Sequence, residues 1–367
     1  MEKIKLGDLC TPSQGQLKEK PDTVIDYIDI SSVDNETKKV TGYQTMTFSE
    51  SPSRARKAVK RGSILVSTVR PNLNAVAILE NDTPILSVAS TGFCILDCKE
   101  DTDERFVFNY CKSKVFIDDM VSQATGASYP AVSDKIVRSA LIPAYSYEKQ
   151  RHIGIILDKV SDVIEKRREE LQALDKLIKA RFVEMFGDPV LNPFSWEMKR
   201  FDEICENLDS RRKPISSGDR VEGIYPYYGA SGIVDYVEDY IFDEDILLVS
   251  EDGANLLMRS TPIAFSVSGK VWVNNHAHVV RFDKMSLQKY VEIYFSLIDI
   301  SDSITGSAQP KLNQAKLNAM MIPIPEDTLL DRYCEFLYQV DKSKVIVQKA
   351  LDEIQTLFDS LMQEYFG

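Results

Sequence analysis

Two long stretches of the chain carry apolar residues at spacings that alternate between three and four positions. They run from Tyr147 to Phe186 and from Asp327 to Phe366, and charged residues fill most of the positions in between. This pattern predicts two long amphipathic helices of the coiled-coil type. At about 1.5 Å per residue, each helix would be roughly 60 Å long. The apolar positions of the two stripes include Leu157, Val160, Ile164, Leu171, Leu174, Leu337, Val340, Leu351 and Ile354.

The two helical stretches belong to a repeat of the whole chain with an offset of 180 residues. Each copy has a long mixed segment, a Thr-Gly turn followed by a proline, an Ile-Pro step, the helical stretch and a Phe-Gly pair. The recurring residues are Thr125 and Thr305, Gly126 and Gly306, Pro130 and Pro310, Ile142 and Ile322, Pro143 and Pro323, Phe186 and Phe366, and Gly187 and Gly367. A duplicated chain presents two similar surfaces, which suits a partner with two sites better than it suits one catalytic pocket.

The repeat divides the sequence into segments 1–146, 147–187, 188–326 and 327–367. Short apolar runs bounded by turn residues predict strands in the mixed segments, for example at Ser63–Ser67 and Ile246–Ser250, and the spacing in Glu104–Phe116 predicts a helix. We therefore expect an α+β protein with two similar mixed α/β domains, separated by two long antiparallel coiled-coil helices and related by a pseudo-twofold axis. The alternative is that each helix packs on its own domain.

Charge limits how this chain could bind nucleic acid. It has 44 Lys and Arg against 56 Asp and Glu, a net charge of -12, so binding would depend on local basic clusters or on a partner. Two such clusters are present, and they contain Arg54, Arg56 and Lys57 in the first domain and Arg211, Arg212 and Lys213 in the second. The alternative for either cluster is a solvated charged face.

Membrane and export signals are missing from the pattern. No run of about 18 apolar residues predicts a transmembrane helix, and the N-terminus lacks the apolar core of a signal peptide. We therefore expect a cytoplasmic protein that does not enter a membrane. The six cysteines contain no Cys-x-x-Cys pair, so buried free thiols are expected rather than disulfides or metal ligands.

The segment Ser67–Asn74 leaves a predicted strand and turns at Pro71. It offers Arg70, Asn72 and Asn74. An arginine can pair with guanine through two hydrogen bonds and an asparagine can pair with adenine in the same way, which makes this loop a candidate for DNA contact. The alternative is a polar loop whose arginine forms a salt bridge.

The other polar motifs do not predict a catalytic, metal or cofactor site. Asn192–Ser195 is similar to the Asn-Pro-Pro-aromatic motif of adenine methyltransferases, but the second proline and a glycine-rich loop for S-adenosylmethionine are missing. Asn274–His278 contains two histidines, and we interpret it as a hydrogen-bonded strand end or turn. Ser250–Asn255 is interpreted as a turn that presents Asn255 and Arg259 outward.

Together with the repeat, several segments resemble the specificity subunits of type I restriction–modification systems over essentially the full length. These segments are Ile64–Leu73, Phe186–Pro189, Val249–Leu256, Ser268–Lys270, Asn274–His278 and Thr305–Leu312. The turn in the second domain carries Gln309 and Lys311, whereas the first domain has Tyr129 in place of the usual glutamine. These three residues join the candidates for DNA contact.

The resemblance implies a chain with no activity of its own, in which each domain reads one half of a split, asymmetric site in double-stranded DNA. It implies that the helices dock two methylation subunits that methylate adenine N6, and that two restriction subunits, where present, add cleavage. S-adenosylmethionine, ATP and Mg²⁺ then belong to the partner subunits. Two alternatives stay open: the specificity subunit of a methylation-only or phage-exclusion system, and a coiled-coil scaffold that binds protein alone.

Overall fold

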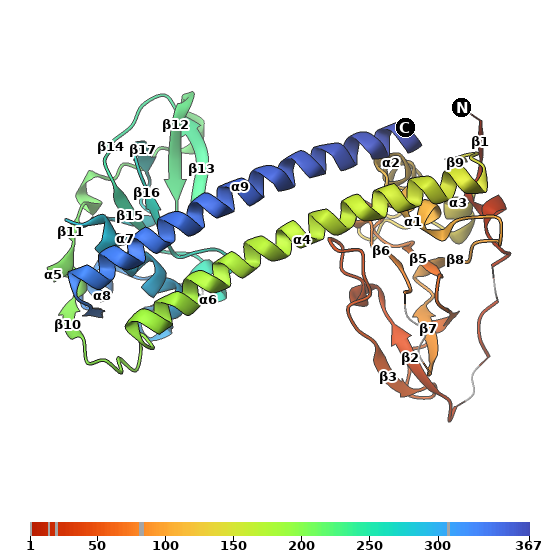
Figure 1. Ribbon diagram of the computed structural model, residues 1–367, viewed down its shortest axis with the longest axis horizontal. Helices are drawn as coiled ribbons and strands as arrows, with labels where there is room; N and C mark the ends of the chain where they lie inside the picture. Colours follow the sequence, from red (N-terminus) through yellow and green to blue (C-terminus); the bar gives the residue numbers. More distant parts are fainter. Residues whose placement is uncertain (1, 14, 19–20, 81–83, 307–308) are drawn as a thin grey trace. The chain divides into compact units, whose positions relative to one another are not determined.

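The computed structural model describes every residue except 1, 14, 19–20, 81–83 and 307–308. The chain forms two compact units. Unit 1 consists of Met1–Glu169 and Gln348–Gly367, and unit 2 consists of Glu170–Val347. Each long helix contributes one part to each unit (Figure 1), so the packed units cut across the four segments into which the sequence repeat divides the chain.

The two long helices are continuous, as the apolar stripes predict. Helix α4 spans Tyr147–Phe186 and helix α9 spans Asp327–Phe366, with 40 residues in each. Gly187 ends α4 with a φ of 81°, and an added Cβ there would lie 2.4 Å from the Pro193 ring, so this position requires glycine.

In both units the helices run antiparallel. In unit 1 the start of α4 packs against the end of α9, because Ile153, Leu157 and Phe366 share one core. In unit 2 the end of α4 packs against the start of α9, where the Tyr333 hydroxyl donates to the Ile178 carbonyl at 3.1 Å. The same cores also contain residues of the mixed domains. The helices therefore pack on each other and on their domains at once.

Unit 1 contains a four-stranded sheet of order β3-β2-β7-β4 and a three-stranded sheet of order β6-β5-β8. Strands β2 and β7 are parallel, and the other neighbours are antiparallel. Strand β1 (Lys3–Lys5) pairs separately with β9 (Leu141–Pro143). The remaining strands are β2 Val24–Ile28, β3 Gln44–Thr47, β4 Ala55–Ala58, β5 Ile64–Ser67, β6 Val76–Ile78, β7 Leu86–Ser90 and β8 Phe93–Leu96.

Strand β5 carries an apolar run, Ile64 to Val66, because it is buried on both faces. Ile64 and Val66 belong to the core that includes the long helices, whereas Leu65 belongs to a second core on the other face. Alternate residues of a strand point to opposite faces, so a strand covered on both sides needs a continuous apolar run.

The helices of unit 1 differ from the sequence prediction at one place. The single helix expected over 104–116 is instead α1 (Glu104–Lys112) followed by α2 (Lys114–Gln123). Ser113 between them has an extended backbone, and its hydroxyl accepts a hydrogen bond from the Phe116 amide at 3.2 Å, which starts the second helix. The shorter helices are η1 Leu6–Leu9, η2 Ile30–Ser32, η3 Pro71–Leu73 and α3 Asp134–Ser139.

Unit 2 repeats this architecture. Its sheets have the orders β13-β12-β17-β14 and β11-β18-β15-β16, with β12 and β17 parallel as β2 and β7 are. The strands are β10 Glu197–Arg200, β11 Glu206–Asn207, β12 Glu222–Gly229, β13 Gly232–Val237, β14 Phe242–Asp243, β15 Ile246–Ser250, β16 Ala264–Val267, β17 Lys270–Val273, β18 Ala277–Arg281 and β19 Met321–Ile324. The helices are α5 Phe201–Ile204, η4 Asp209–Arg211, η5 Ser217–Asp219, α6 Asn255–Met258, α7 Met285–Leu297, η6 Ser301–Ser303 and α8 Gln314–Asn318.

The repeat is therefore structural as well as sequential. Strand β15 lies between two cores as β5 does, with Leu247 and Val249 on one side and Ile246 and Leu248 on the other. Across the part of the chain that the model describes, we find no helix with the length and apolar character that a bilayer crossing needs. The six cysteines are free thiols.

Candidate nucleic-acid interface

The same turn follows the central strand in both units. In unit 1 the chain leaves β5, and the Arg70 amide donates to the Pro130 carbonyl at 2.7 Å. In unit 2 the chain leaves β15, and the Gly253 amide donates to the Pro310 carbonyl at 3.0 Å. Arg70 and Gly253 thus occupy equivalent positions, and both have positive φ, at 48° and 108°.

The Thr-Gly turns that contact these positions depend on their glycines. Gly126 and Gly306 both have positive φ. A Cβ added to Gly126 would lie 2.8 Å from the Tyr129 carbonyl oxygen, and one added to Gly306 would lie 2.6 Å from that of Gln309. Glycine is therefore required in both copies, which explains why the Thr-Gly step recurs. Gln309 itself is exposed.

Arg70 is displayed at the surface of unit 1. Its guanidinium carbon lies 4.9 Å from the centre of the Tyr129 ring, and Tyr129 is 70% exposed. Asn72 is also exposed, in the short helix η3. Arg70 thus contacts Tyr129 and lies two residues before Asn72. The three predicted residues present a cation, an aromatic face and an amide to solvent.

Asn74 corrects the sequence prediction. It is buried, and its amide nitrogen donates to the Cys111 carbonyl at 2.9 Å. Its backbone carbonyl accepts from Lys38 Nζ at 2.6 Å. Asn74 therefore holds the end of the loop in place and does not offer its side chain to a ligand.

The first basic cluster is largely used inside unit 1. Arg54 pairs with Asp29 at 2.6 Å, and Lys57 pairs with Asp134 at 2.6 Å while also donating to the Phe93 carbonyl. Arg56 donates to the Ala55 carbonyl and lies over the Phe48 ring. Of the three, Arg54 is exposed and Arg56 and Lys57 are half-buried, so the cluster offers less free positive charge than its sequence indicates.

The second cluster contains a further correction. Arg211 is exposed, pairs with Glu244 at 2.6 Å and lies over the Phe242 ring. Lys213 is exposed. Arg212, in contrast, keeps only 13% of its side-chain exposure and contacts Glu251 at 2.6 Å and Asp209 at 3.2 Å. Arg212 is part of the fold of unit 2 and not a surface cation.

Arg212 belongs to a buried group of charges between β18, η4 and the end of β15. Asp209 contacts His278 Nδ1 at 2.6 Å, and His278 Nε2 lies 2.8 Å from the Leu312 carbonyl. Lys311 Nζ pairs with the other Glu251 oxygen at 3.0 Å. Burial raises the pKa of Asp209 and of Glu251, but hydrogen bonds and charges from these partners bring the net pKa of both below the ordinary value.

This group is an ion-pair network. Asp209, Glu251 and His278 do offer ligand atoms within 4.8 Å of one another, as a metal site would. However, Arg212 and Lys311 already contact the two carboxylates. A metal ion would have to displace those two cations, so the residues present fit the side-chain cations better than a metal.

Asn255 and Arg259 also differ from their prediction, because both are half-buried and their side chains are held by hydrogen bonds within unit 2. The Asn255 carboxamide accepts from the Thr261 amide at 3.0 Å and from the Ser260 hydroxyl at 2.9 Å. Arg259 donates to the carbonyls of Phe295 and Ile298, both at 2.9 Å, at the end of α7. These bonds hold both side chains against the turn after β15, and Asn255 also lines the pocket next to it.

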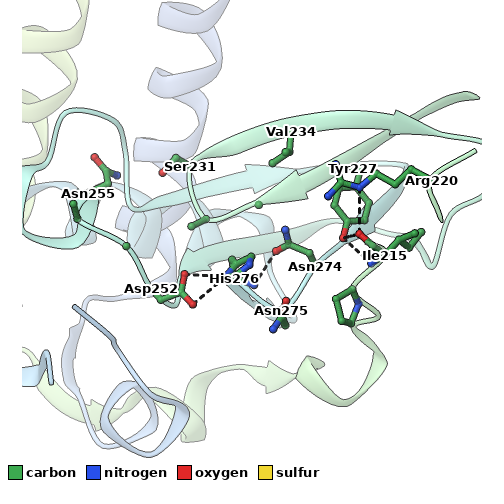
Figure 2. Close-up of a pocket in the computed structure, with 15 residues that line it drawn as sticks. Ile215, Arg220, Tyr227, Ser231, Val234, Asp252, Asn255, Asn274, Asn275 and His276 are labelled. Carbon is green, nitrogen blue, oxygen red and sulfur yellow. Dashed lines mark hydrogen bonds and ion pairs between the residues drawn. The ribbon is translucent and has the colours of Figure 1, made fainter. Parts of the chain in front are cut away.

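Next to that turn, unit 2 has a pocket of about 570 Å³ that is lined by both apolar and polar residues. Figure 2 shows Asp252 and His276 facing each other, with Asn274 and Asn275 beside them. The His276 ring lies 2.9 and 3.0 Å from the two Asp252 oxygens, and the His276 amide donates to Asn274 at 2.8 Å. The residues that line the pocket include Arg220, Tyr227, Ser231, Asp252, Gly253, Asn255, Asn274, Asn275 and His276.

The sequence did not predict this pocket. Asn274–His278 was predicted to form a hydrogen-bonded turn or strand end, which the Asn274–His276 hydrogen bond confirms. What the prediction missed is that this turn, β12 and the turn after β15 converge. The two histidines of this segment lie in different surroundings. His278 is buried in the ion-pair network, whereas His276 is half exposed at the pocket.

The apolar stripes of the long helices serve the chain's own packing. Leu157, Leu337 and Val340 are buried in the two cores, so they cannot also contact a partner, and the docking role predicted for them is corrected. Ile164 is buried as well, and the half-buried members of the stripes are Val160, Leu171, Leu174, Leu351 and Ile354. Apolar residues of the other helix faces are exposed instead, and they include Val163, Leu177, Tyr338, Val345, Ile346 and Leu357.

Comparisons with known proteins agree on one family. The sequence-family model of the type I restriction modification DNA specificity domain matches residues 1–175 and 193–356 of this chain. A type I restriction enzyme specificity subunit of Haemophilus influenzae is 36% identical over 140 residues, 38% of this chain and 36% of that protein. The MjaIX specificity subunit of Methanocaldococcus jannaschii is 21% identical over 337 residues, 82% of this chain and 76% of that protein.

One solved structure shows the likeness at the level of the fold. The type I restriction–modification system S subunit from M. genitalium has a TM-score of 0.62 and 15% sequence identity, with 100% of this chain and 96% of that chain covered. The first sequence match spans little more than a third of its relative, whereas the structural match spans both chains.

Proposed function

This chain belongs to the type I restriction–modification DNA specificity family, and we propose that it selects the DNA sequence on which a methylation complex acts. Each unit reads one part of a bipartite site in double-stranded DNA. The observation that carries the proposal is the equivalence of Arg70 and Gly253, which share one backbone position on two copies of the same turn. The backbone turn is the same in both units, whereas the side chains that it carries differ. Recognition of two different half-sites requires such a difference.

In unit 1 the reading group is the pair Arg70 and Tyr129 together with Asn72. A guanidinium can hold the O6 and N7 atoms of guanine or a phosphate, and the tyrosine ring below it limits its orientations. The exposed ring also offers an apolar face to a thymine methyl group or a sugar.

In unit 2 the reading group is the pocket beside Asp252 and His276. Gly253 adds no side chain there, so the backbone turn leaves room beside Asp252 and His276. Asn275 is exposed at the pocket edge, and a carboxamide can pair with adenine through two hydrogen bonds. Gln309 and Lys311 lie in the turn that contacts Gly253, and they would approach the DNA backbone from the same side.

The charge of the chain supports a requirement for partners. With a net charge of -12 and much of the basic clusters paired internally, this chain lacks the broad positive surface that gives most DNA-binding proteins their affinity. We infer that methylation subunits supply phosphate contacts. Two such subunits, one for each copy of the repeat, would dock on the outward apolar residues of α4 and α9.

The chemistry belongs to those partners. The chain is proposed to be non-catalytic and cytoplasmic, with S-adenosylmethionine bound by the methylation subunits and ATP with Mg²⁺ by restriction subunits where the system has them. Adenine N6 methylation at the selected site is then the immediate outcome, and cleavage of unmodified DNA is the second.

The test uses the purified full chain and its methylation partner. Alone, the chain should show weak, strongly salt-dependent DNA binding and no methyl transfer. With the partner, it should protect a defined bipartite sequence, and methylation should appear at adenines within it. Methyl transfer by the chain alone, or a complex that methylates without sequence preference, would refute the proposal.

A further inference from the structure

Unit 1 contains two cysteines that face each other across a short antiparallel ladder. Cys10 follows η1, and Cys98 follows β8, and the two form an antiparallel bridge. The Thr11 amide donates to the Asp97 carbonyl at 2.8 Å, and the Lys99 amide donates to the Leu9 carbonyl at 3.0 Å. These two bonds flank the cysteines, which makes them a non-hydrogen-bonded pair.

That pairing type brings side chains close together. In a non-hydrogen-bonded antiparallel pair, the two Cα atoms are about 4.5 Å apart and the side chains lie on the same face. A disulfide spans Cα separations of about 4.4 to 6.8 Å. The backbone of unit 1 is therefore already arranged for a bond between Cys10 and Cys98 without movement of either strand.

The two sulfurs also interact. A hydrogen bond from the Cys98 thiol lowers the pKa of Cys10, burial opposes this and the charge of Arg138 adds to it, with a net lowering. Arg138 is fixed nearby by bonds from its guanidinium to the carbonyls of Thr11 and Ile95, both at 2.9 Å. The same hydrogen bond raises the pKa of Cys98, as does its burial. Cys10 is the better nucleophile, and Cys98 is the partly exposed member of the pair.

Unit 2 lacks such a pair at the equivalent place. There β11 and β18 pair Glu206 with Arg281, and this register places Phe282 opposite Cys205. The Cys205 thiol donates to the Phe201 carbonyl at 3.2 Å. The repeat thus carries a facing dithiol in unit 1 and a cysteine opposite a phenylalanine in unit 2.

We propose that Cys10 and Cys98 are a reversible oxidation site, at which hydrogen peroxide converts the facing thiols to a disulfide. The Cys10 thiolate attacks one peroxide oxygen, the O–O bond breaks, and the leaving hydroxide takes up the thiol proton as water. Cys98 sulfur then attacks the resulting sulfenic acid, the S–O bond breaks, and a second water leaves with the Cys98 proton. The two sulfurs lose two electrons in total, and the peroxide gains them. The bond joins the N-terminal segment to the sheet that carries the Arg70 turn.

The experiment treats the purified full chain with hydrogen peroxide and maps its peptides without reduction. We expect a cross-linked peptide pair containing Cys10 and Cys98, 2 Da lighter than the sum of the two free peptides, which dithiothreitol separates. The thermal unfolding midpoint should rise on oxidation and return on reduction. Cys98→Ser should abolish both effects, whereas Cys205→Ser should leave both in place.

Two results would overturn the proposal. One is a chain that keeps Cys10 and Cys98 reduced at peroxide concentrations that oxidise a facing dithiol in a reference protein. The other is oxidation that stops at sulfinic acid or that joins a different pair, such as Cys94 with Cys111. Both outcomes are read on the wild-type chain, so the test does not depend on whether a variant folds.

Discussion

The guanidinium carbon of Arg70 lies 4.9 Å from the centre of the exposed Tyr129 ring. Of the carboxylates in the described ranges, none forms an ion pair with Arg70 at 4.0 Å or less. A ring orients a cation without neutralising it, so Arg70 keeps its charge for a ligand. This distinguishes it from Arg54 and Lys57, which are paired with carboxylates of the same unit.

Replacement of Arg70 by alanine should weaken specific DNA binding by the assembled complex. A contact to guanine would make the loss about 1–3 kcal/mol and confine it to one base of one half-site, whereas a phosphate contact would lower affinity for all sequences and reduce the salt dependence. Titration of DNA at several salt concentrations, with matched and mismatched half-sites, distinguishes the two.

The matched control for that variant is Arg105→Ala. Arg105 is also a partly exposed arginine of unit 1, but it pairs with Glu80 and Asp158. The Arg105→Ala variant should therefore leave the DNA affinity of the complex unchanged. If Arg70→Ala lowered the thermal midpoint and not the affinity, Arg70 would belong to the fold.

Replacement of Asn275 by alanine should relax the half-site read by unit 2 and leave that of unit 1 intact. Asn275 lines the pocket from an exposed turn, so its loss should not affect stability. Asn274→Ala is the contrasting variant, because Asn274 is buried and accepts a hydrogen bond from the His276 amide, and its loss should lower stability. Selection of bound sequences from a randomised pool measures the effect. An unchanged preference in the unit 2 half would remove Asn275 from the interface.

Adjacent arginines in unit 2 should behave in opposite ways. Arg212→Ala leaves Asp209 and Glu251 without their buried cation, which should cost about 3 kcal/mol of unfolding free energy. Arg211→Ala breaks a pair in which the arginine side chain is 43% exposed, and it should cost less than about 1 kcal/mol. Urea unfolding followed by tryptophan fluorescence reports on unit 2, because Trp196 and Trp272 both lie there. Equal costs would contradict the assignment of Arg212 to the ion-pair network.

The same network predicts how stability depends on pH. Asp209 and Glu251 have a lowered pKa in the folded chain, so the unfolded chain binds more protons in the acid range. Their contribution is fully present above the ordinary carboxyl pKa of about 4 and is lost as the pH falls through the folded values. The urea midpoint of unit 2 should therefore fall from about pH 5 towards pH 3, and Glu251→Gln should flatten that slope. A midpoint that rises on acidification would contradict the lowered pKa.

Much of the fold follows from the sequence because it depends on periodic patterns. The apolar stripes gave the bounds of α4 and α9, and Gly187 marks the end of α4 because a side chain there would overlap Pro193. Strand β15 lies where its continuous apolar run predicts it. The break at Ser113 was missed because a serine with helical neighbours does not disturb the spacing of apolar residues on either side.

The candidate interface was less predictable, because exposure depends on contacts between distant segments. Arg212 and Arg211 are neighbours in a basic run, yet Arg212 is buried by Asp209, Glu251 and the start of β18. Asn74 and Asn72 are two residues apart, yet Asn72 is exposed whereas Asn74 is buried and bonds to α1. The pocket in unit 2 likewise forms from four separate segments of the chain, within 214–220, 227–234, 252–255 and 274–276.

The central claim is that the two units specify two half-sites independently. The most direct measurement replaces residues 1–146 with the corresponding segment of another family member, expresses the chimera with the methylation partner, and maps methylated adenines across a host genome. We predict that one half of the methylated sequence changes to that of the donor and that the half read by unit 2 stays the same. A change in both halves, or in neither, would contradict independent recognition by the two copies of the repeat.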